Sequence, residues 1–401
     1  MNADDATTRI FISVAEDSAD IHAAALLRAA ARELPDCAFY GLTGPRMRAA
    51  GAATLADLTA HAAMLTGVFS VLGRAYRAIR IVERDWDAAP PSLAVLLDSP
   101  ELNLRLARKA HARGIPVLYY IAPQTWASRP GRNRAISRIV DRLACILPFE
   151  EDYFRTAGIR TDYVGHPLFE TLANERIEEQ KVARLRIGSE PLIAILPGSR
   201  RHVIDAVLPL QLDVLEKMRR AGANVRAAIS AVSEERAAQI RELLEQRGTN
   251  ATIVVAENAA LLSAADLVLV ASGTATLHAA HYRKPMVVMY ETGRLLCTLY
   301  PLLGRFIVKT PHLSLVNILA GRRVVPEFMP FVRDTAEVAR VAARLLTDVT
   351  WRKIMVEELD EIVRPLEKTE ASTNVCGIIR EMLGRTAGDT KPIRREVEAN
   401  A

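Results

Sequence analysis

Short runs of apolar residues alternate with amphipathic stretches in the first part of the chain. The runs predict strands buried on both faces, at residues 9–14, 93–97, 117–120 and 143–147. The amphipathic stretches between them predict helices, at residues 20–33 and 101–113. This order of strands and helices is typical of a parallel sheet covered by helices on both faces, which is an α/β fold.

The alternation restarts at Leu192, after a charged stretch at residues 170–189. The pattern therefore predicts two Rossmann-like domains, 1–168 and 169–348. Helices at 349–384 are expected to pack back on the first domain, and a charged tail at 385–401 is expected to be disordered. The second domain's expected strands are 192–196, 225–229, 252–255, 267–270 and 286–290, and its expected helices are 205–221, 233–247 and 274–282.

Two turns in the second domain carry the most chemical information. Leu196-Pro-Gly-Ser-Arg-Arg201 and Val270-Ala-Ser-Gly-Thr-Ala-Thr-Leu277 each join an expected strand to an expected helix. Such a turn presents free backbone N–H groups and the positive end of a helix dipole, which together favour phosphate. One such turn would be weak evidence for a phosphate site, because Gly and Ser cap many helices. Two turns, one with an arginine pair, indicate a nucleotide diphosphate in a cleft between the doubly wound domains.

Composition narrows the class of protein only modestly. A net charge of +5 over 401 residues is compatible with an anionic substrate or an anionic membrane surface. Nucleic acid is disfavoured, because there is no basic tract and no zinc-ligand spacing. The four cysteines lie far apart and the eight histidines lack metal-ligand spacing, which predicts a cytosolic protein without a metal site. We find no secretion signal and no apolar stretch of membrane-spanning length.

Asp98 ends an apolar strand in Leu96-Leu-Asp-Ser-Pro100. A carboxylate at the carboxyl end of a strand is well placed to act as a general base. Asp is equally common as a cap of the helix that starts near Pro100, so both interpretations stay open. Asn103 lies in the first turns of that helix, and its side chain is expected to point to the same cleft.

Other polar residues follow the first-domain strands. Ser18 and Asp20 follow the first strand and could bind an anion or a sugar hydroxyl, or simply cap a helix. Arg46 offers a cation at the start of another helix, and Trp126 offers an aromatic surface. His166, in a Gly-His-Pro turn, is as compatible with a structural role as with a catalytic one.

Apolar residues and arginines are interleaved at residues 64–80, which include Phe69. An apolar face flanked by arginines is typical of a membrane interface or an acyl-chain site, and also of a core-facing helix with a solvated edge. A second stretch of this kind lies at residues 295–308.

These motifs, in this order, resemble those of the lipid-A-disaccharide synthase family. The resemblance runs in order from about residue 10 to 330. The matching motifs are Ser18-x-Asp20, Gly44-Pro-Arg46, Asp98-Ser-Pro100 with Asn103, Pro123-x-x-Trp126, Leu147-Pro-Phe-Glu150, Val164-Gly-His-Pro-Leu168, Leu196-Pro-Gly-Ser-Arg200, Ala271-Ser-Gly-Thr-Ala-Thr-Leu277, Pro285-Met-Val-Val288, Asn317-Ile-Leu-Ala-Gly-Arg322 and Val324-Val-Pro-Glu327.

The resemblance implies an inverting glycosyltransferase of the GT-B type, with two Rossmann-like domains that face a cleft. It implies the transfer of 2,3-diacylglucosamine from UDP to 2,3-diacylglucosamine 1-phosphate (lipid X), which forms the β-1,6 disaccharide of lipid A and UDP. Family members need no metal or other cofactor and work peripherally on the cytoplasmic face of the inner membrane. The resemblance also leaves open whether the protein forms a homodimer.

The resemblance also assigns roles to residues. The first domain is expected to hold the acceptor and its lipid, and the second the UDP-sugar. Asp98 is the expected base on the acceptor's 6-hydroxyl. The expected UDP-binding residues are Ser199, Arg200, Ser272, Gly273, Thr274, Thr276, His278 and Asn317. The expected acceptor or lipid contacts are Ser18, Asp20, Arg46, Asn103, Trp126 and Phe69.

Several positions depart from the family pattern, and they cluster at the expected site. Two glycines of the first turn are replaced by Ala15 and Ala19, and a glutamate is replaced by His278. The departures leave two rivals open: a transferase of the same fold with another UDP-sugar or lipid acceptor, and a UDP- or lipid-binding protein without turnover. A nucleotide-sugar 2-epimerase shares the fold but not the long match. The other departures are Ser70, Ser128, Val203 and Val316.

Overall fold

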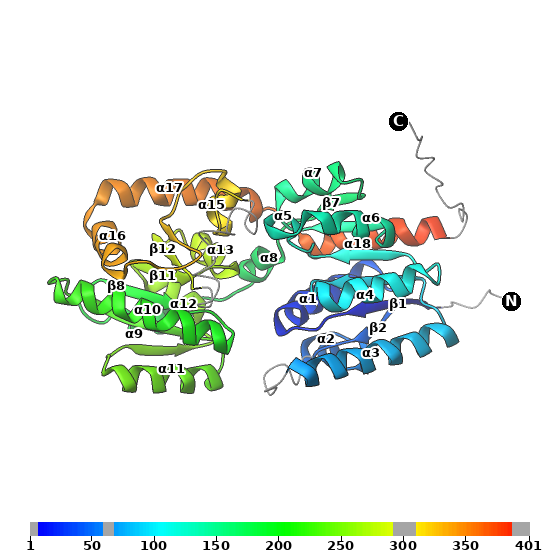
Figure 1. Ribbon diagram of the computed structural model, residues 1–401, viewed down its shortest axis with the longest axis horizontal. Coiled ribbons are helices and arrows are strands. Elements are labelled where there is room, and N and C mark those ends of the chain that lie inside the picture. The colour runs from blue at the N-terminus through cyan, green and yellow to red at the C-terminus, as the bar shows by residue number, and fades with distance from the viewer. Residues whose placement is uncertain (1–6, 59–67, 292–309, 387–401) are drawn as a thin grey trace. The chain divides into compact units, whose positions relative to one another are not determined.

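A computed structural model describes residues 7–58, 68–291 and 310–386 of the chain. The chain forms two compact units (Figure 1). Unit 1 comprises Met1–Thr125, Arg129–Pro167 and Glu370–Ala401, and unit 2 comprises Trp126–Ser128 and Leu168–Thr369. The chain thus leaves unit 1 at the Gly-His-Pro turn and returns to it near Glu370.

Unit 1 is built on a seven-stranded sheet of order β3-β2-β1-β4-β5-β6-β7, in which every pairing is parallel. The order reverses between β1 and β4, as in a Rossmann fold. The strands are β1 (Thr8–Ser13), β2 (Cys37–Leu42), β3 (Ala53–Ala56), β4 (Leu93–Leu97), β5 (Val117–Tyr120), β6 (Arg142–Cys145) and β7 (Thr161–Tyr163).

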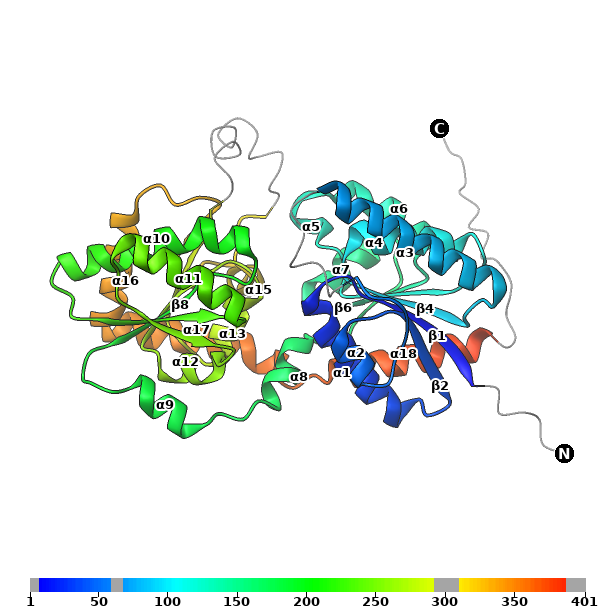
Figure 2. The ribbon, with the colours of Figure 1, turned by 90° about the horizontal axis from the view of Figure 1, so that it is seen from below.

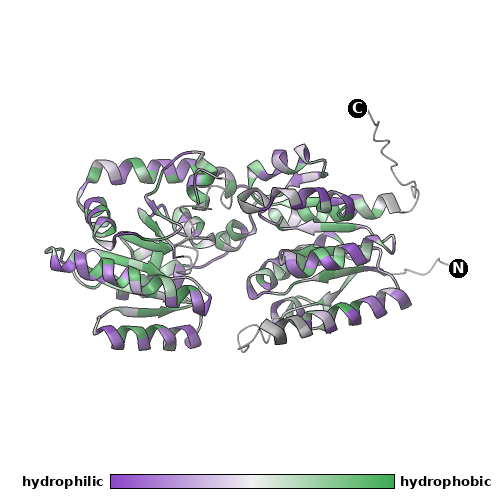
Figure 3. Cartoon of the chain, in the orientation of Figure 1, coloured by the Kyte–Doolittle hydropathy of each residue, from purple (hydrophilic) through white to green (hydrophobic). Residues whose placement is uncertain are grey.

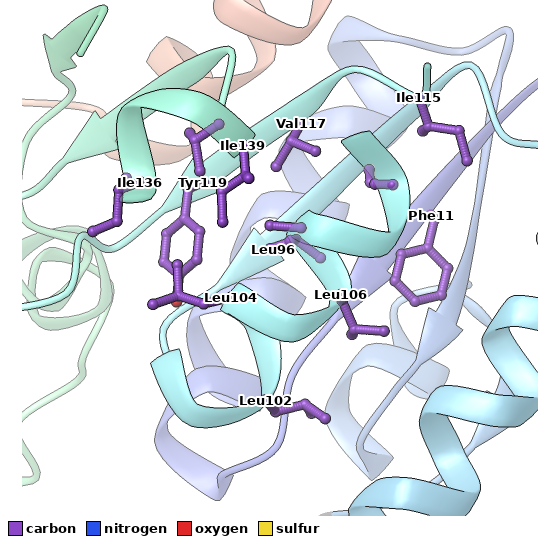
Figure 4. Close-up of a cluster of buried hydrophobic side chains, with 14 of the residues drawn as sticks. Phe11, Leu96, Leu102, Leu104, Leu106, Ile115, Val117, Tyr119, Ile136 and Ile139 are labelled. Carbon is purple, nitrogen blue, oxygen red and sulfur yellow. The ribbon is translucent and has the colours of Figure 1, made fainter. Parts of the chain in front are cut away.

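Helices cover both faces of this sheet and enclose one hydrophobic core on each (Figure 2). On one face the core lies under α3, α4 and α6, and Figure 4 shows part of it around Phe11 and Leu106. Phe11 also packs edge to face with Trp86, with ring centroids 5.0 Å apart. On the other face α1 packs against α2 and α18. The helices of unit 1 are α1 (Asp17–Glu33), α2 (Pro45–Ala49), α3 (Val68–Ala88), α4 (Pro100–His111), α6 (Asn133–Ile139), α7 (Pro148–Thr156) and α18 (Ala371–Thr386). The short helix α5 (Thr125–Ser128) begins in unit 1, but its other residues are assigned to unit 2.

Unit 2 repeats the plan with a six-stranded parallel sheet of order β10-β9-β8-β11-β12-β13. The order reverses between β8 and β11. Both units are therefore doubly wound, as the alternation of strands and helices predicts. The strands are β8 (Leu192–Leu196), β9 (Arg226–Ala231), β10 (Thr252–Val255), β11 (Leu267–Ala271), β12 (Met286–Met289) and β13 (Glu327–Phe328).

The central strands of unit 2 are buried on both faces, since β8 and β11 are apolar throughout and buried along their length. In Figure 3 the strands are mostly green, while the helices carry green and purple, as amphipathic helices do. The helices are α8 (Pro167–Ala173), α9 (Glu179–Leu185), α10 (Arg201–Arg220), α11 (Glu234–Arg247), α12 (Asn258–Ala264), α13 (Thr274–His281), α15 (Leu315–Ala320), α16 (Thr335–Thr347) and α17 (Val349–Leu366).

The C-terminal helices divide between the two units. Helix α17 contacts α13, α15 and α16 of unit 2, and Arg283 binds Asp360 and Glu367 of this helical region. Helix α18 instead packs on α1 of unit 1, where Glu381 binds Arg142. The expected return of the chain at residue 349 is therefore too early by about one helix. None of the described helices combines the length and apolar character needed to cross a bilayer.

His166 is buried at the point where the chain leaves unit 1, with 3% of its surface exposed. Burial, and then the neighbouring His22, lower its pKa from 6.5 to about 3. The unfolded chain therefore binds more protons than the folded chain between these values, so stability falls as the pH drops below about 6.5. From about pH 7 to about pH 5, this one group is expected to remove roughly 2 kcal/mol of unfolding free energy.

His166→Gln is expected to reduce that acid sensitivity. Urea unfolding of the wild type and the variant at both pH values measures it, with the exposed His111→Gln as the control. Equal losses in the wild type and His166→Gln would show that His166 is not the group responsible.

Candidate functional site

The carboxyl edge of the unit 1 sheet contains an unusual backbone. Three residues without the freedom of glycine have left-handed φ angles there: Asp98 at 48°, Ser99 at 44° and Ile121 at 63°. Asp98 and Ile121 directly follow the paired strands β4 and β5, whose last residues Leu97 and Tyr120 are in register. Left-handed φ is disfavoured for these residues, most of all for the β-branched Ile121. Such strain concentrates at functional sites, which makes this edge a candidate independently of any motif.

Asn103 has a different role from the expected one. Its side chain is fully buried in α4, and its hydrogen bonds go to other residues of unit 1. Its amide nitrogen donates to the carbonyl oxygens of Leu97 (2.7 Å) and Asp98 (2.9 Å), and its amide oxygen accepts from the hydroxyl of Ser13 (2.8 Å). Asn103 therefore holds the turn that presents Asp98.

Asp20 is also internal. It is fully buried, and its two carboxylate oxygens accept from the backbone N–H groups of Arg46 (2.9 Å) and Met47 (3.0 Å), at the start of α2. Asp20 thus caps the neighbouring helix α2, which agrees with the capping interpretation of the sequence. The Arg46 side chain is about half exposed and pairs with Asp17, and Ser18 is exposed in the first turn of α1.

The structure describes only one of the two aromatic side chains, Trp126 and Phe69, that are expected to contact the acceptor or its lipid. Trp126 is 8% exposed in α5, so little of its ring is offered to solvent. Phe69 belongs to the first turn of α3, but its side chain lies outside the described residues. The second apolar stretch, at residues 295–308, also lies outside them.

In unit 2 the two glycine-containing turns lie side by side. They follow β8 and β11, which are neighbours in the sheet and pair in register from Leu267 and Ile193 to Val270 and Leu196. The strand order reverses between these two strands, and ligands of such sheets bind beyond the carboxyl ends at that point. The two turns are therefore close enough within unit 2 to contribute to one anion site, as the sequence predicts.

The first turn is shaped by Gly198, which has a φ of +107°. A Cβ at this position would come within 2.8 Å of Cγ1 of Val203, so only glycine fits without a shift. Ser199 and Arg200 follow it and are both exposed, with Arg200 at the N-cap of α10. An exposed arginine at a helix N-terminus adds its charge to the free N–H groups of the helix.

The second turn is shaped by Gly273, whose φ is +129°. No described heavy atom lies within 4 Å of the place that a Cβ would take, so the turn is open around it. Ser272 is half-buried and Thr274 is exposed, whereas Thr276 is fully buried and its hydroxyl donates to the carbonyl of Gly273 (2.8 Å). Thr276 thus stabilises the turn from inside the fold.

His278 lies one helical turn beyond Thr274 on α13, with 13% of its side chain exposed. Burial, followed by the charge of His281, lowers the pKa of His278 to about 4, so the ring is neutral at neutral pH. Its Nε2 lies 3.9 Å from Oε2 of Glu175 and makes no hydrogen bond to a described residue. Burial raises the pKa of Glu175.

Asn317 is fully buried, and its side-chain hydrogen bonds go to other parts of the protein. Its amide nitrogen donates to Glu327 Oε2 (3.0 Å) and to the carbonyl of Val325 (2.9 Å), and its oxygen accepts from the N–H groups of Val324 and Val325. Asn317 therefore joins α15 to β13. Glu327, with its neighbour His312, lines a cavity of about 350 Å³ on unit 2.

Comparison with known proteins identifies the family. A family model described as lipid-A-disaccharide synthetase matches residues 10–376. The lipid-A-disaccharide synthase of Myxococcus xanthus is 35% identical over 379 residues, covering 94% of this chain and 97% of that protein. The synthase of Solibacter usitatus is 37% identical over 381 residues, with the same coverage of both chains. The chain belongs to the lipid-A-disaccharide synthase family.

Members of the lipid-A-disaccharide synthase family are glycosyltransferases that act in lipid A synthesis. The fold agrees with that class. The S. aureus MnaA–UDP co-structure has a TM-score of 0.65 at 10% identity, covering 96% of this chain and 99% of that one. CalG4, the calicheamicin glycosyltransferase, has a TM-score of 0.59 at 15% identity, covering 95% and 100%. At these identities the structures show the shared GT-B fold alone.

Sequence reasoning about this synthase-family chain missed three residues at the carboxyl edge of unit 1. Ser13 and Tyr119 are fully buried in β1 and β5, and Ile121 carries the strained backbone. Of these three residues, only Ser13 could have been noticed in the sequence, because it is a polar residue at the end of an otherwise apolar strand. Nothing in the sequence indicates the φ angle of Ile121.

Proposed function

We propose that this chain is an inverting glycosyltransferase that joins UDP-2,3-diacylglucosamine to 2,3-diacylglucosamine 1-phosphate, and so forms the β-1,6 disaccharide of lipid A and UDP. One observation supports the binding of the UDP-sugar donor. In this member of the family, the two turns that contain Gly198 and Gly273 follow neighbouring strands and lead into α10 and α13. Two helix N-termini and Arg200 can together receive a diphosphate.

In the proposed reaction the acceptor's 6-hydroxyl oxygen attacks the anomeric carbon of the donor sugar. The bond from that carbon to the diphosphate oxygen breaks, and its electron pair leaves with UDP. Attack from the face opposite the leaving group inverts the configuration. The hydroxyl proton passes to the carboxylate of Asp98, which the left-handed turn after β4 presents at the sheet edge.

UDP gains negative charge as it leaves, so groups that stabilise this charge accelerate the reaction. Arg200 is exposed at the N-cap of α10, and Ser272 and Thr274 are accessible at the start of α13. We assign the diphosphate to these groups and to Ser199. Thr276 and Asn317 support the donor site from within the fold rather than by contact.

The other proposed partner is the cytoplasmic face of the inner membrane, where acylated substrates reside. Helix α3 supports this peripheral contact, because it exposes Tyr76 (59%) and Ile81 (41%) beside the exposed Arg77 and Arg80. Apolar side chains flanked by cations are typical of helices that lie on an anionic bilayer.

A second candidate is a transferase of this fold that uses another UDP-sugar or lipid acceptor. His278 favours it, since a neutral ring stands where the family pattern has a carboxylate. The neutral ring changes the hydrogen bonds available to the donor, because it can donate from one nitrogen and accept at the other.

The test is a direct assay of the purified protein with both diacylglucosamine substrates, with UDP release and disaccharide followed by mass spectrometry. We expect equal amounts of UDP and disaccharide. Turnover only with other UDP-sugars would replace the proposal by the second candidate. UDP binding without turnover on any of these donors would show a binding protein.

A further inference from the structure

Three fully buried polar side chains converge on the turn formed by Asp98 and Ser99. Asn103 binds the carbonyls of Leu97 and Asp98, as described above, and Ser13 fixes the amide of Asn103 by donating to its oxygen. Tyr119 adds the third contact, since its hydroxyl donates to the carbonyl of Asp98 at 2.6 Å. The Asp98 carbonyl thus accepts from two side chains at once.

These contacts oppose an intrinsic cost. Each left-handed residue other than glycine costs about 1–2 kcal/mol, and here two follow one another. Helix α4 does not supply the compensation through its cap, because Ser99 makes no side-chain capping bond. The Asp98 backbone N–H is held as well, by the carbonyl of Tyr120 at 3.0 Å. Side chains and backbone together fix the turn.

Tyr119 is suited to this task because its hydroxyl remains a donor. Burial, followed by the negative charges of Asp98 and Glu101, holds its pKa well above the ordinary value. Figure 4 shows its ring among hydrophobic side chains that include Leu104 of α4 and Ile136 of α6. The packed ring limits movement of the hydroxyl and therefore of the carbonyl that it holds.

We propose that Ser13, Asn103 and Tyr119 are positioning residues of the glycosyl transfer: through the backbone of the Asp98–Ser99 turn they fix the direction of the Asp98 carboxylate. None of the three touches substrate. The inference rests on the proposed function, in which Asp98 is the base. The rate of proton transfer depends steeply on geometry. If the turn relaxes toward ordinary φ values, we therefore expect kcat to fall while substrate binding stays largely intact.

Tyr119→Phe is the sharpest test, because it removes one hydrogen bond and keeps the packed ring. Replacing Asn103 would leave the buried Leu97 carbonyl and the Ser13 hydroxyl without this partner, and so would test folding as well as the position of the turn. Tyr40→Phe is the matched control. Its hydroxyl donates to Asp85 at 2.8 Å, and its ring lies in the same core cluster, but on β2, at a distance in the sheet from the Asp98 turn.

We expect Tyr119→Phe to lower kcat about tenfold or more with KM for both substrates within about twofold of wild type. Tyr40→Phe is expected to shift the urea unfolding midpoint by a similar amount and to keep wild-type kcat. Equal kcat in the two variants, or a loss confined to KM, would overturn the positioning role. An active Asp98→Asn variant would instead overturn the proposed base, whatever Tyr119→Phe does, so the two failures are distinguishable.

Discussion

Asp98→Asn is expected to lower kcat by about 10²–10⁴-fold, the range that a positioned general base contributes. The amide cannot accept the acceptor's hydroxyl proton, so the attacking oxygen would have to lose it to water. Asn tolerates left-handed φ as well as Asp does, which should leave the strained turn and its contacts in place. UDP affinity should be unchanged, because the proposed donor groups belong to unit 2. Disaccharide formation and UDP titration calorimetry measure the two quantities.

Asp152→Asn is the control for that substitution. Asp152 is exposed on α7 of unit 1, so its loss makes the same change of charge away from the turn. The control is expected to retain wild-type kcat. If Asp98→Asn kept more than about half of the wild-type kcat, general-base catalysis by Asp98 would be excluded, because such a base contributes far more.

The fold follows from the sequence wherever strands are buried on both faces. Leu93–Leu97, Val117–Tyr120 and Leu192–Leu196 begin and end as the apolar runs predict. The strands that the pattern did not reveal include the sheet-edge strands β3 and β7. They are only four and three residues long and are not buried along their length, so neither gives the long buried apolar run that marks a central strand.

The sequence predicts the placement of the candidate residues at the sheet edges better than it predicts the contacts that each of them makes. Polar residues at strand ends and glycine turns mark both carboxyl edges, and the structure has them there. Asn103, Asp20 and Asn317 were nevertheless expected to contact substrate, and each is fully buried with protein partners. The sequence cannot separate these roles, because the decisive partners are distant: the hydrogen bond between Ser13 and Asn103 spans 90 positions.

Arg200→Ala is expected to lower kcat/KM for the donor by about 10²–10³-fold, comparable to removing one oxyanion donor elsewhere. The leaving diphosphate gains charge at the bond that breaks, and the family resemblance implies no metal to offset it. Arg200 is one of two exposed arginines, with Arg201, at the glycine turn of β8, and it occupies the N-cap position of α10. Its loss should weaken UDP binding as well as turnover, which calorimetry and initial rates measure separately.

Arg200→Lys separates charge from shape at the same position. A lysine keeps the positive charge but loses the planar, two-pronged contact with phosphate, so an intermediate rate is expected. Arg241→Ala, at an exposed position on α11, is the control for loss of one positive charge on unit 2 and should match wild type. UDP affinity and kcat both within about threefold of wild type in Arg200→Ala would remove this arginine from the diphosphate site, because charge-assisted phosphate contacts are worth more than that. In that case, the backbone N–H groups at the starts of α10 and α13 would be the groups that stabilise the charge on the leaving diphosphate.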